Sequence, residues 1–214
     1  MEICHPSNAR PQPIQLIQNP DDDELIPLVS YMIDMEKTAE VRALAPQLKS
    51  LKHDMQNALV QEAAFHGSLQ MLQCLLDALG LIHSVDLFRT CAIESIKGEN
   101  VEILEWAAPK LPQANERVST LELAYMHLGA NTESPEIFEI WKKHLSRHKM
   151  NKSPLIIEDF VIRRVKDPAK QERLASLFRD QAFLGQLTTR HLSCGLRVVA
   201  STTCSVSLAR AMLD

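Results

Sequence analysis

The chain has 214 residues, of which 45% are apolar and 23% are charged, and its formal net charge is −4. This balance excludes a disordered chain, and no apolar run approaches the ~18 to 20 residues of a membrane-spanning helix. Glycine is scarce at six residues and aromatic residues make up only 5%, while Leu, Ala, Glu, Gln and Met recur, so we expect an all-α protein.

Segment 1–21 is expected to form an extended, proline-rich leader. Four of the eleven prolines lie within this segment, and proline fixes φ and removes a hydrogen-bond donor. The acidic run Asp21–Glu24 suits the first turn of a helix, so folded structure is expected to begin near Asp22. The leader has neither a basic opening nor a contiguous apolar core. We therefore see no secretory signal and expect an intracellular protein, cytoplasmic or nuclear.

The rest of the chain repeats an apolar pattern at intervals that are typical of helical repeat proteins. Matching patterns occur at 69–77, 101–108, 136–145, 172–178 and 206–214. Gly67, Gly98 and Gly129 are equally spaced, and each follows one short apolar helix pattern and precedes a second. Because one helix pair cannot bury its own apolar face, such a period indicates a stacked repeat array.

The best copy resembles the helical part of an ankyrin repeat. Its order is Ala63-Ala64, Gly67, Leu69, Met71-Leu72, Leu75-Leu76, Asp77-Ala78 and Gly80. The Thr-Pro-Leu-His opening of a standard unit is absent, and connections such as 81–86 leave little room for a β-finger. The resemblance implies an α-solenoid of stacked helix-turn-helix repeats, ankyrin-like with reduced or missing β-fingers. It would form one domain of about five to six units at 22–214, and an unclassified α-solenoid of helix hairpins is the structural alternative.

Both ends of the repeat region are atypical. Segment 25–51 is helical in pattern but lacks the central glycine, as an N-terminal cap would. The last pattern stops at Leu213-Asp214 without a polar closing helix. We expect either that the chain is a piece of a longer protein or that a partner covers its terminal face.

The resemblance implies a noncatalytic interaction module that binds another protein through its concave face. In ankyrin proteins, the end of the first helix and the adjoining turn contribute to ligand contacts. The paired positions here are Phe65, His66, Ile96, Lys97, His127 and Leu128. Because each pair precedes one of the equally spaced glycines, stacking would align the pairs in a continuous stripe, unless Phe65 and Ile96 simply pack between repeats.

A basic cluster is the strongest electrostatic feature of the sequence. Its residues include Lys142, Lys143, Arg147, Lys149, Arg163 and Arg164. Such a cluster is a solvated face or a patch for an acidic protein partner. Nucleic acid is the less favoured partner, because no aromatic residues are interleaved with the basic ones as a base-stacking platform requires.

Two pairs that contain histidine are candidates for chemistry. His144 and His148 would share a helix face, but the basic residues around them would repel a metal ion, and no third ligand is signalled. His191 and Cys194 lack a visible orienting group, so we expect the histidine at the surface and the thiol in the core. The five cysteines lack paired spacing and are expected to be small buried side chains in a reducing compartment.

No catalytic group, metal or cofactor is predicted. The alternative function is a small enzyme or ligand-binding protein with a cavity in the repeat array, in which His66, His127 or His191 would act as acid or base. Of the two tryptophans, Trp141 is expected in the core and Trp106 is expected to be partly exposed. The oligomeric state is left open.

Overall fold

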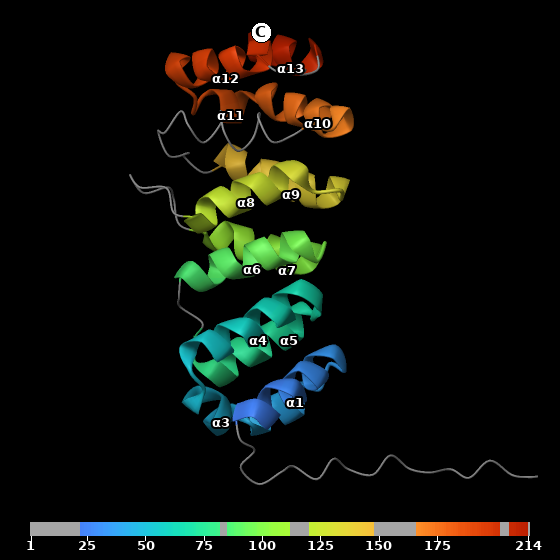
Figure 1. Cartoon of the computed structure of the whole chain (residues 1–214), viewed down its shortest axis with the longest axis vertical. Helices are drawn as coiled ribbons and strands as arrows, with labels where there is room; N and C mark the ends of the chain where they lie inside the picture. Colours follow the sequence, from blue (N-terminus) through green and yellow to red (C-terminus); the bar gives the residue numbers. More distant parts are fainter. Residues whose placement is uncertain (1–21, 82–84, 112–119, 148–165, 202–205, 214) are drawn as a thin grey trace, which may run out of the picture.

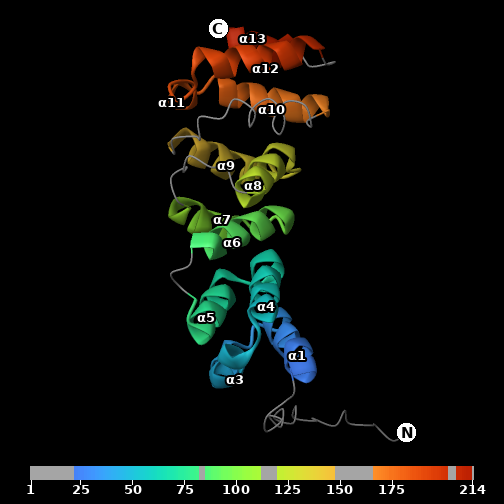
Figure 2. The same cartoon turned by 60° about the vertical axis from the view of Figure 1, so that its left-hand side comes forward.

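The computed structural model describes residues 22–81, 85–111, 120–147, 166–201 and 206–213. Every regular element within these ranges is a helix, so the predicted all-α class is confirmed for them. The helices follow one another in chain order along the long axis of the molecule, as both views show (Figures 1 and 2). In the described residues, no helix is both long enough and apolar enough to cross a membrane.

Three helix hairpins form the middle of the stack. They are α4 (His53–His66) with α5 (Leu69–Leu79), α6 (Val85–Lys97) with α7 (Val101–Ala107), and α8 (Thr120–Asn131) with α9 (Pro135–Arg147). The first helices pack in a row, α4 against α6 and α6 against α8, while α7 contacts both α5 and α9. The short helix η1 (Ala108–Lys110) continues α7.

The N-terminal end replaces a regular hairpin with one helix and two short ones. These are α1 (Asp22–Asp34), α2 (Thr38–Ala43) and α3 (Ala45–Ser50); α1 packs on α4, and α2 and α3 pack on α5. The first described helix begins at Asp22. The predicted helical segment 25–51 is interrupted twice, because Glu36 adopts a positive φ of 54° and Pro46 favours the first turn of a new helix.

The turns of the hairpins share one register, which is set by the residues that cap the second helices. Ser68 Oγ accepts from Met71 N, Asn100 Oδ1 accepts from Ile103 N, and Ser134 Oγ accepts from Ile137 N. Each of these caps follows the previous one by one repeat of the apolar pattern. Side-chain caps of this kind satisfy backbone N–H groups that a helix N-terminus leaves unpaired.

This register corrects the prediction that three glycines mark the turns. Gly67 and Gly98 lie in turns, but Gly129 lies inside α8. A Cβ at position 129 would stand 2.2 Å from Cδ1 and Nε1 of Trp141, so this glycine lets the α9 indole pack against α8. The equal spacing of the three glycines therefore does not reflect an equal place in the repeat.

The C-terminal end also departs from the predicted order. It contains α10 (Pro168–Phe178), α11 (Gln181–Leu184), α12 (Thr189–Ser201) and α13 (Val206–Leu213). The sequence pattern predicts that 172–178 is the second helix of a pair, like α5, α7 and α9. Instead α10 packs on α13 and contacts the first helix α8, whereas α11 contacts the second helix α9.

The core of the described residues contains several large aromatic side chains. The fully buried ones are Trp141, Phe138, Phe178 and Phe183. Trp106 is half-buried under the Lys110 ammonium, which lies 4.2 Å from its ring centroid, so both tryptophan predictions are confirmed. Cys74, Cys91 and Cys194 are buried thiols as predicted, while Cys4 and Cys204 lie outside the described residues. Burial raises the pKa of the Cys91 thiol to about 12.

Candidate interaction surface

Side-chain hydrogen bonds join three successive turns between first and second helices. We call residues 34–37, 65–68, 97–100 and 131–134 the turn edge. Ser68 donates from its backbone N and its Oγ to the Glu36 carboxylate, at 2.8 and 2.6 Å. Asn100 Nδ2 donates to the carbonyl oxygen of Gly67 at 2.8 Å. These bonds fix the spacing between adjacent hairpins.

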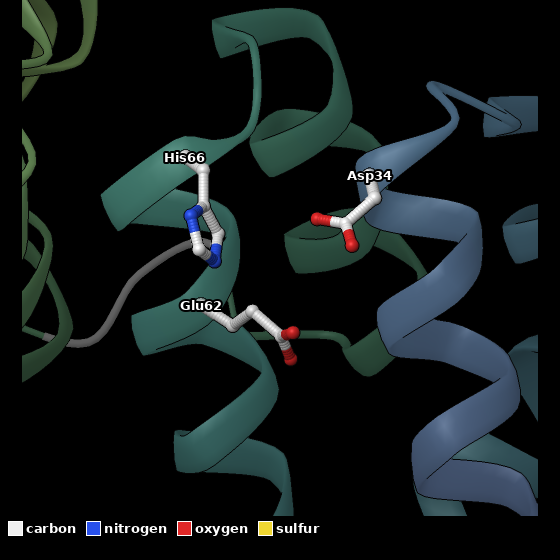
Figure 3. A group of neighbouring side chains, drawn as sticks. All are labelled: Asp34, Glu62 and His66. Carbon is white, nitrogen blue, oxygen red and sulfur yellow. The ribbon is translucent and has the colours of Figure 1, made fainter.

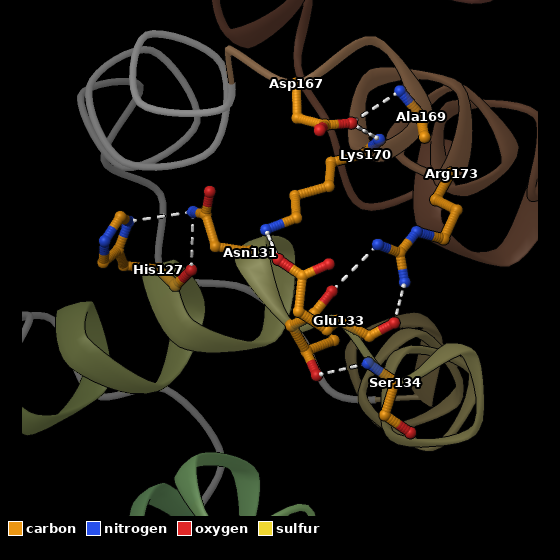
Figure 4. A network of polar contacts seen from close by, with 9 residues as sticks. His127, Asn131, Glu133, Ser134, Asp167, Ala169, Lys170 and Arg173 are labelled. Atoms are coloured by element: carbon orange, nitrogen blue, oxygen red, sulfur yellow. Dashed lines mark hydrogen bonds and ion pairs between the residues drawn. The ribbon is translucent and has the colours of Figure 1, made fainter.

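A polar network continues the turn edge to α10 (Figure 4). The Arg173 guanidinium donates to the carbonyl oxygens of Thr132 and Glu133, and Lys170 forms an ion pair with the Glu133 carboxylate. Asp167 caps α10 by accepting from Ala169 N and Lys170 N, and these two bonds lower the pKa of its carboxyl. The fourth turn is thereby attached to the C-terminal helices.

Two glutamates on the turn edge adopt a backbone conformation that normally favours glycine. Glu36 and Glu99 both have φ of 54°, and each lies one residue before the N-cap of the helix that follows. Lys37 N donates to Met32 O and Asn100 N donates to Ser95 O, which is the hydrogen bond that closes a Schellman turn. Gly98 makes room in the third turn, since a Cβ there would lie 2.0 Å from the Phe65 oxygen.

Large apolar side chains are exposed at the adjoining ends of α1 and α4. Tyr31 is 47% exposed, Met35 54% and Phe65 38%. Lys37 Nζ lies 4.9 Å from the Tyr31 ring centroid, and the Phe65 ring meets the His66 ring edge to face at 5.0 Å. We call Tyr31, Met35 and Phe65 the apolar patch. Tyr31 and Met35 were not predicted from the sequence, although their spacing of four places them on one helix face.

The predicted partner-binding stripe is only partly assembled. Phe65, His66 and Lys97 are exposed, whereas Ile96 is 4% exposed and belongs to the core. Ile96 occupies the position of Ala64 and Ala130, which are also buried, because this position faces the neighbouring helices. Its predicted partner-binding role is therefore wrong.

His127 and Leu128 lie about one turn before the end of α8, out of register with Phe65 and Lys97. Both are half-buried. The residue of α8 that matches Phe65 and Lys97 in its place relative to the cap is Asn131, whose Nδ2 donates to His127 O and lies 3.1 Å from His127 Nδ1. The two residues fall out of register because the prediction counted from the glycines and not from the caps.

The predicted acidic-partner patch lies mostly outside the described side chains. Lys149, Arg163 and Arg164 are outside the described residues, as is the Arg147 side chain. Lys143 is exposed on α9, but Lys142 is half-buried and pairs with Glu139 at 2.8 Å.

A groove of about 870 Å³ lies between α7, η1, α9 and α11. Its polar lining is largely engaged in contacts within the protein. Tyr125 Oη lies 3.1 Å from His144 Nδ1, and burial raises the pKa of the tyrosine. Asp180 caps α11 by accepting from Ala182 N and Phe183 N, and the bond from Phe183 N is the main cause of the lowered pKa of its carboxyl. His148, which the sequence places on the same helix face as His144, lies outside the described residues.

The histidines of the alternative enzyme function are not brought together. His66, His127 and His191 belong to α4, α8 and α12, which lie at three different levels of the stack (Figure 1). His191 is 4% exposed, so its predicted surface position is wrong. Its Nδ1 accepts from Thr188 N at 2.9 Å at the start of α12. Cys194 is buried, and Arg197 donates to its Sγ at 3.0 Å.

Comparisons of the chain with protein-family models, with curated proteins and with solved structures each found no match.

Proposed function

We propose that this chain is a noncatalytic protein-interaction module, an α-solenoid of ankyrin-like helix pairs that binds a partner through the turn edge. The observation that carries the proposal is the apolar patch at the ends of α1 and α4. Among the described residues, most large apolar side chains are buried, whereas Tyr31, Met35 and Phe65 are exposed at the ends of two helices that pack together. Exposed aromatic and methionine side chains are typical anchors of protein interfaces.

The charges around the patch favour a protein over a nucleic acid. Four carboxylates are exposed on the turn edge, those of Asp34, Glu36, Glu99 and Glu133. Glu133 is paired with Lys170 of α10, and Lys37 and Lys97 are the lysines of the described turn-edge residues. Carboxylates in this number would repel phosphate groups. The surface therefore suits a protein segment that inserts apolar side chains into the patch and carries basic groups for the flanking glutamates. An acidic partner would have to use the separate basic residues of α9 and beyond.

The array of hairpins supports the same proposal. First helices pack on first helices, and the caps recur at 68, 100 and 134. Such stacking presents equivalent turns along one edge, which gives a partner an extended surface. The groove beside α9 supports the enzyme alternative less well, because its histidine, aspartate and Lys142 are already hydrogen-bonded or paired within the protein.

The test is site-specific cross-linking followed by affinity measurement. The chain is expressed with a photoreactive amino acid at position 35 in the cells that make the protein. After cross-linking, the captured partner is identified by mass spectrometry. The purified partner is then titrated against the parent chain and the variant Tyr31→Ser/Phe65→Ser. We expect affinity at least tenfold lower for this variant, because interface anchors contribute more than about 1.4 kcal/mol.

The matched control removes exposed apolar side chains elsewhere. Val206 and Leu213 of α13 are 82% and 71% exposed, so Val206→Ser/Leu213→Ser changes surface apolarity without touching the patch. Circular dichroism verifies that both variants stay folded. Equal affinity of parent and patch variant would contradict the proposal, as would an equal loss in the control.

A further inference from the structure

Three potential metal ligands converge where α1 and α4 end (Figure 3). Asp34 is the last residue of α1, and Glu62 and His66 lie in the last turns of α4. One ligand atom from each residue lies within 4.8 Å of the other two. Glu62 and His66 are four residues apart on one helix, so their side chains project from the same face. We propose that these three residues bind a divalent transition-metal ion, with Zn²⁺ as the ion that their chemistry fits best.

The donor set matches zinc in kind and number. One imidazole and two carboxylates supply nitrogen and oxygen ligands, and three protein ligands plus water is a common zinc arrangement. Ligand atoms around tetrahedral Zn²⁺ stand about 3.4 Å apart, given metal–ligand distances near about 2.1 Å. Asp34 and His66 are exposed and can rotate to close the remaining distance. Mg²⁺ and Ca²⁺ prefer shells built from oxygen, so the imidazole disfavours them.

The surroundings favour a cation at this point. Both α1 and α4 end here, so the partial negative charges of two helix C-termini add to the two carboxylates. Among the described residues, neither Asp34 nor Glu62 forms an ion pair with a lysine or arginine. A pair of carboxylates at a negative helix end is unfavourable by itself, and a metal ion would remove that repulsion.

One of the ligands is held in place by a neighbour. Ser30 Oγ donates to Glu62 Oε2 at 2.6 Å, which orients the carboxylate and leaves its other oxygen for a metal. Hydrogen bonds of this type from outside the ligand shell tune metal affinity. Since Ser30 and Asp34 belong to α1 and Glu62 belongs to α4, a bound ion would join the two helices. The ion would bind independently of the proposed partner, and none of the three patch residues is a ligand.

The test is titration of the full chain with Zn²⁺ by isothermal calorimetry in a Cys4→Ser/Cys204→Ser background. That background removes the thiols that lie outside the described residues and could bind zinc independently. We expect one equivalent of Zn²⁺ to bind and a rise in melting temperature upon binding. His66→Gln, Asp34→Asn and Glu62→Gln should each weaken binding at least tenfold. Ser30→Ala should weaken it about tenfold to a hundredfold.

His53→Gln is the matched control, because His53 is an exposed histidine at the opposite end of α4. It should bind Zn²⁺ like the parent. Absence of binding in the parent would overturn the proposal. Unchanged affinity in all three ligand variants would also overturn it, as would displacement of Zn²⁺ by equimolar Ca²⁺. Zn²⁺ titration of the chain alone needs no partner, so a chain that binds no Zn²⁺ can still bind a partner through the apolar patch.

Discussion

At the scale of single residues, two glutamates with positive φ allow the energetic cost of backbone strain to be measured apart from the contribution of a side-chain contact. Glu36 and Glu99 have the same φ of 54° at equivalent places in two turns. The Glu36 carboxylate accepts two hydrogen bonds from Ser68. Glycine adopts positive φ without the steric cost of a Cβ, so Glu99→Gly is expected to stabilise the protein by about 1 kcal/mol.

Glu36→Gly is the matched comparison. It relieves the same strain but removes two hydrogen bonds to Ser68, each worth about 1 kcal/mol. We expect this variant to be no more stable than the parent. Urea unfolding at neutral pH measures both changes. Equal stabilisation by the two substitutions would show that the Glu36–Ser68 contact contributes nothing.

Acid sensitivity is the second prediction at this scale. Bonds from Lys170 N and Ala169 N lower the pKa of Asp167 below that of an unfolded aspartate. A lowered pKa means that the ionised cap stabilises the fold above the unfolded value of about 3.9, and that this stability is lost as the pH falls toward the folded value. Asp167→Asn keeps a capping oxygen that does not titrate. The variant should show a flatter decline of the urea midpoint between about pH 5 and pH 3.

Because the pKa of the Asp180 carboxyl is also lowered, part of the pH dependence of stability will remain in Asp167→Asn. Asp180→Asn and the double variant therefore complete the set. The double variant should have the flattest profile of the four proteins. Identical profiles for parent and double variant would show that the two caps do not carry the acid sensitivity.

At the scale of elements, the packing of α8 on α9 depends on the absence of a side chain at position 129. A Cβ there would lie 2.2 Å from the Trp141 ring, which is fully buried. Gly129→Ala should improve helix propensity, yet the overlap should cost about 1 to 3 kcal/mol and dominate. Gly185→Ala is the control, because a Cβ at position 185 would lie 3.3 Å from its nearest neighbour, Gln181 O. Thermal unfolding compares the two.

A second substitution tests whether the cost arises at the indole. In the Trp141→Phe background, Gly129→Ala should be less damaging, and a double-mutant cycle gives the coupling between the two positions. Additive effects would mean that the clash does not explain the loss.

Much of the helical fold could be predicted from the sequence, because apolar residues at helical spacing require a neighbour that covers them. The helices at 69–79, 101–107 and 135–147 follow this pattern. Their caps, Ser68, Asn100 and Ser134, are residue types that favour a helix N-terminus. The glycine spacing was the misleading signal, since Gly129 is required by its contact with Trp141 on the next helix, which no local pattern reveals.

The candidate surface was less predictable for a related reason. Phe65, His66 and Lys97 were predicted because each lies just before one of the recurring apolar patterns, and all three are exposed. Asp34 and Met35 belong to the atypical first unit, so the repeat gave no reason to align them with the end of α4. Their approach to that helix depends on how α1 packs against α4, which is a tertiary contact.

At the scale of the whole molecule, the order of contacts predicts how the chain unfolds. Neighbouring elements account for the main contacts among the described helices, with α4 on α6, α6 on α8 and α10 on α13. In a repeat array, stability is approximately a sum of local terms and nearest-neighbour interfaces. A destabilising substitution near one end should therefore unfold the helices at that end first and leave the amide hydrogens of distant helices protected from exchange.

Phe183→Ala and Leu72→Ala are matched destabilising substitutions, one toward each end of the stack of helices. Phe183 is 1% exposed and meets the Phe178 ring at 5.6 Å, and Leu72 is fully buried in α5. Each substitution should cost about 2 to 5 kcal/mol. Hydrogen exchange read by mass spectrometry should show faster exchange in α10–α13 for Phe183→Ala and in α1–α5 for Leu72→Ala. If either variant instead loses protection uniformly along the chain, the stack unfolds as one cooperative unit, and the description as an array of semi-independent hairpins fails.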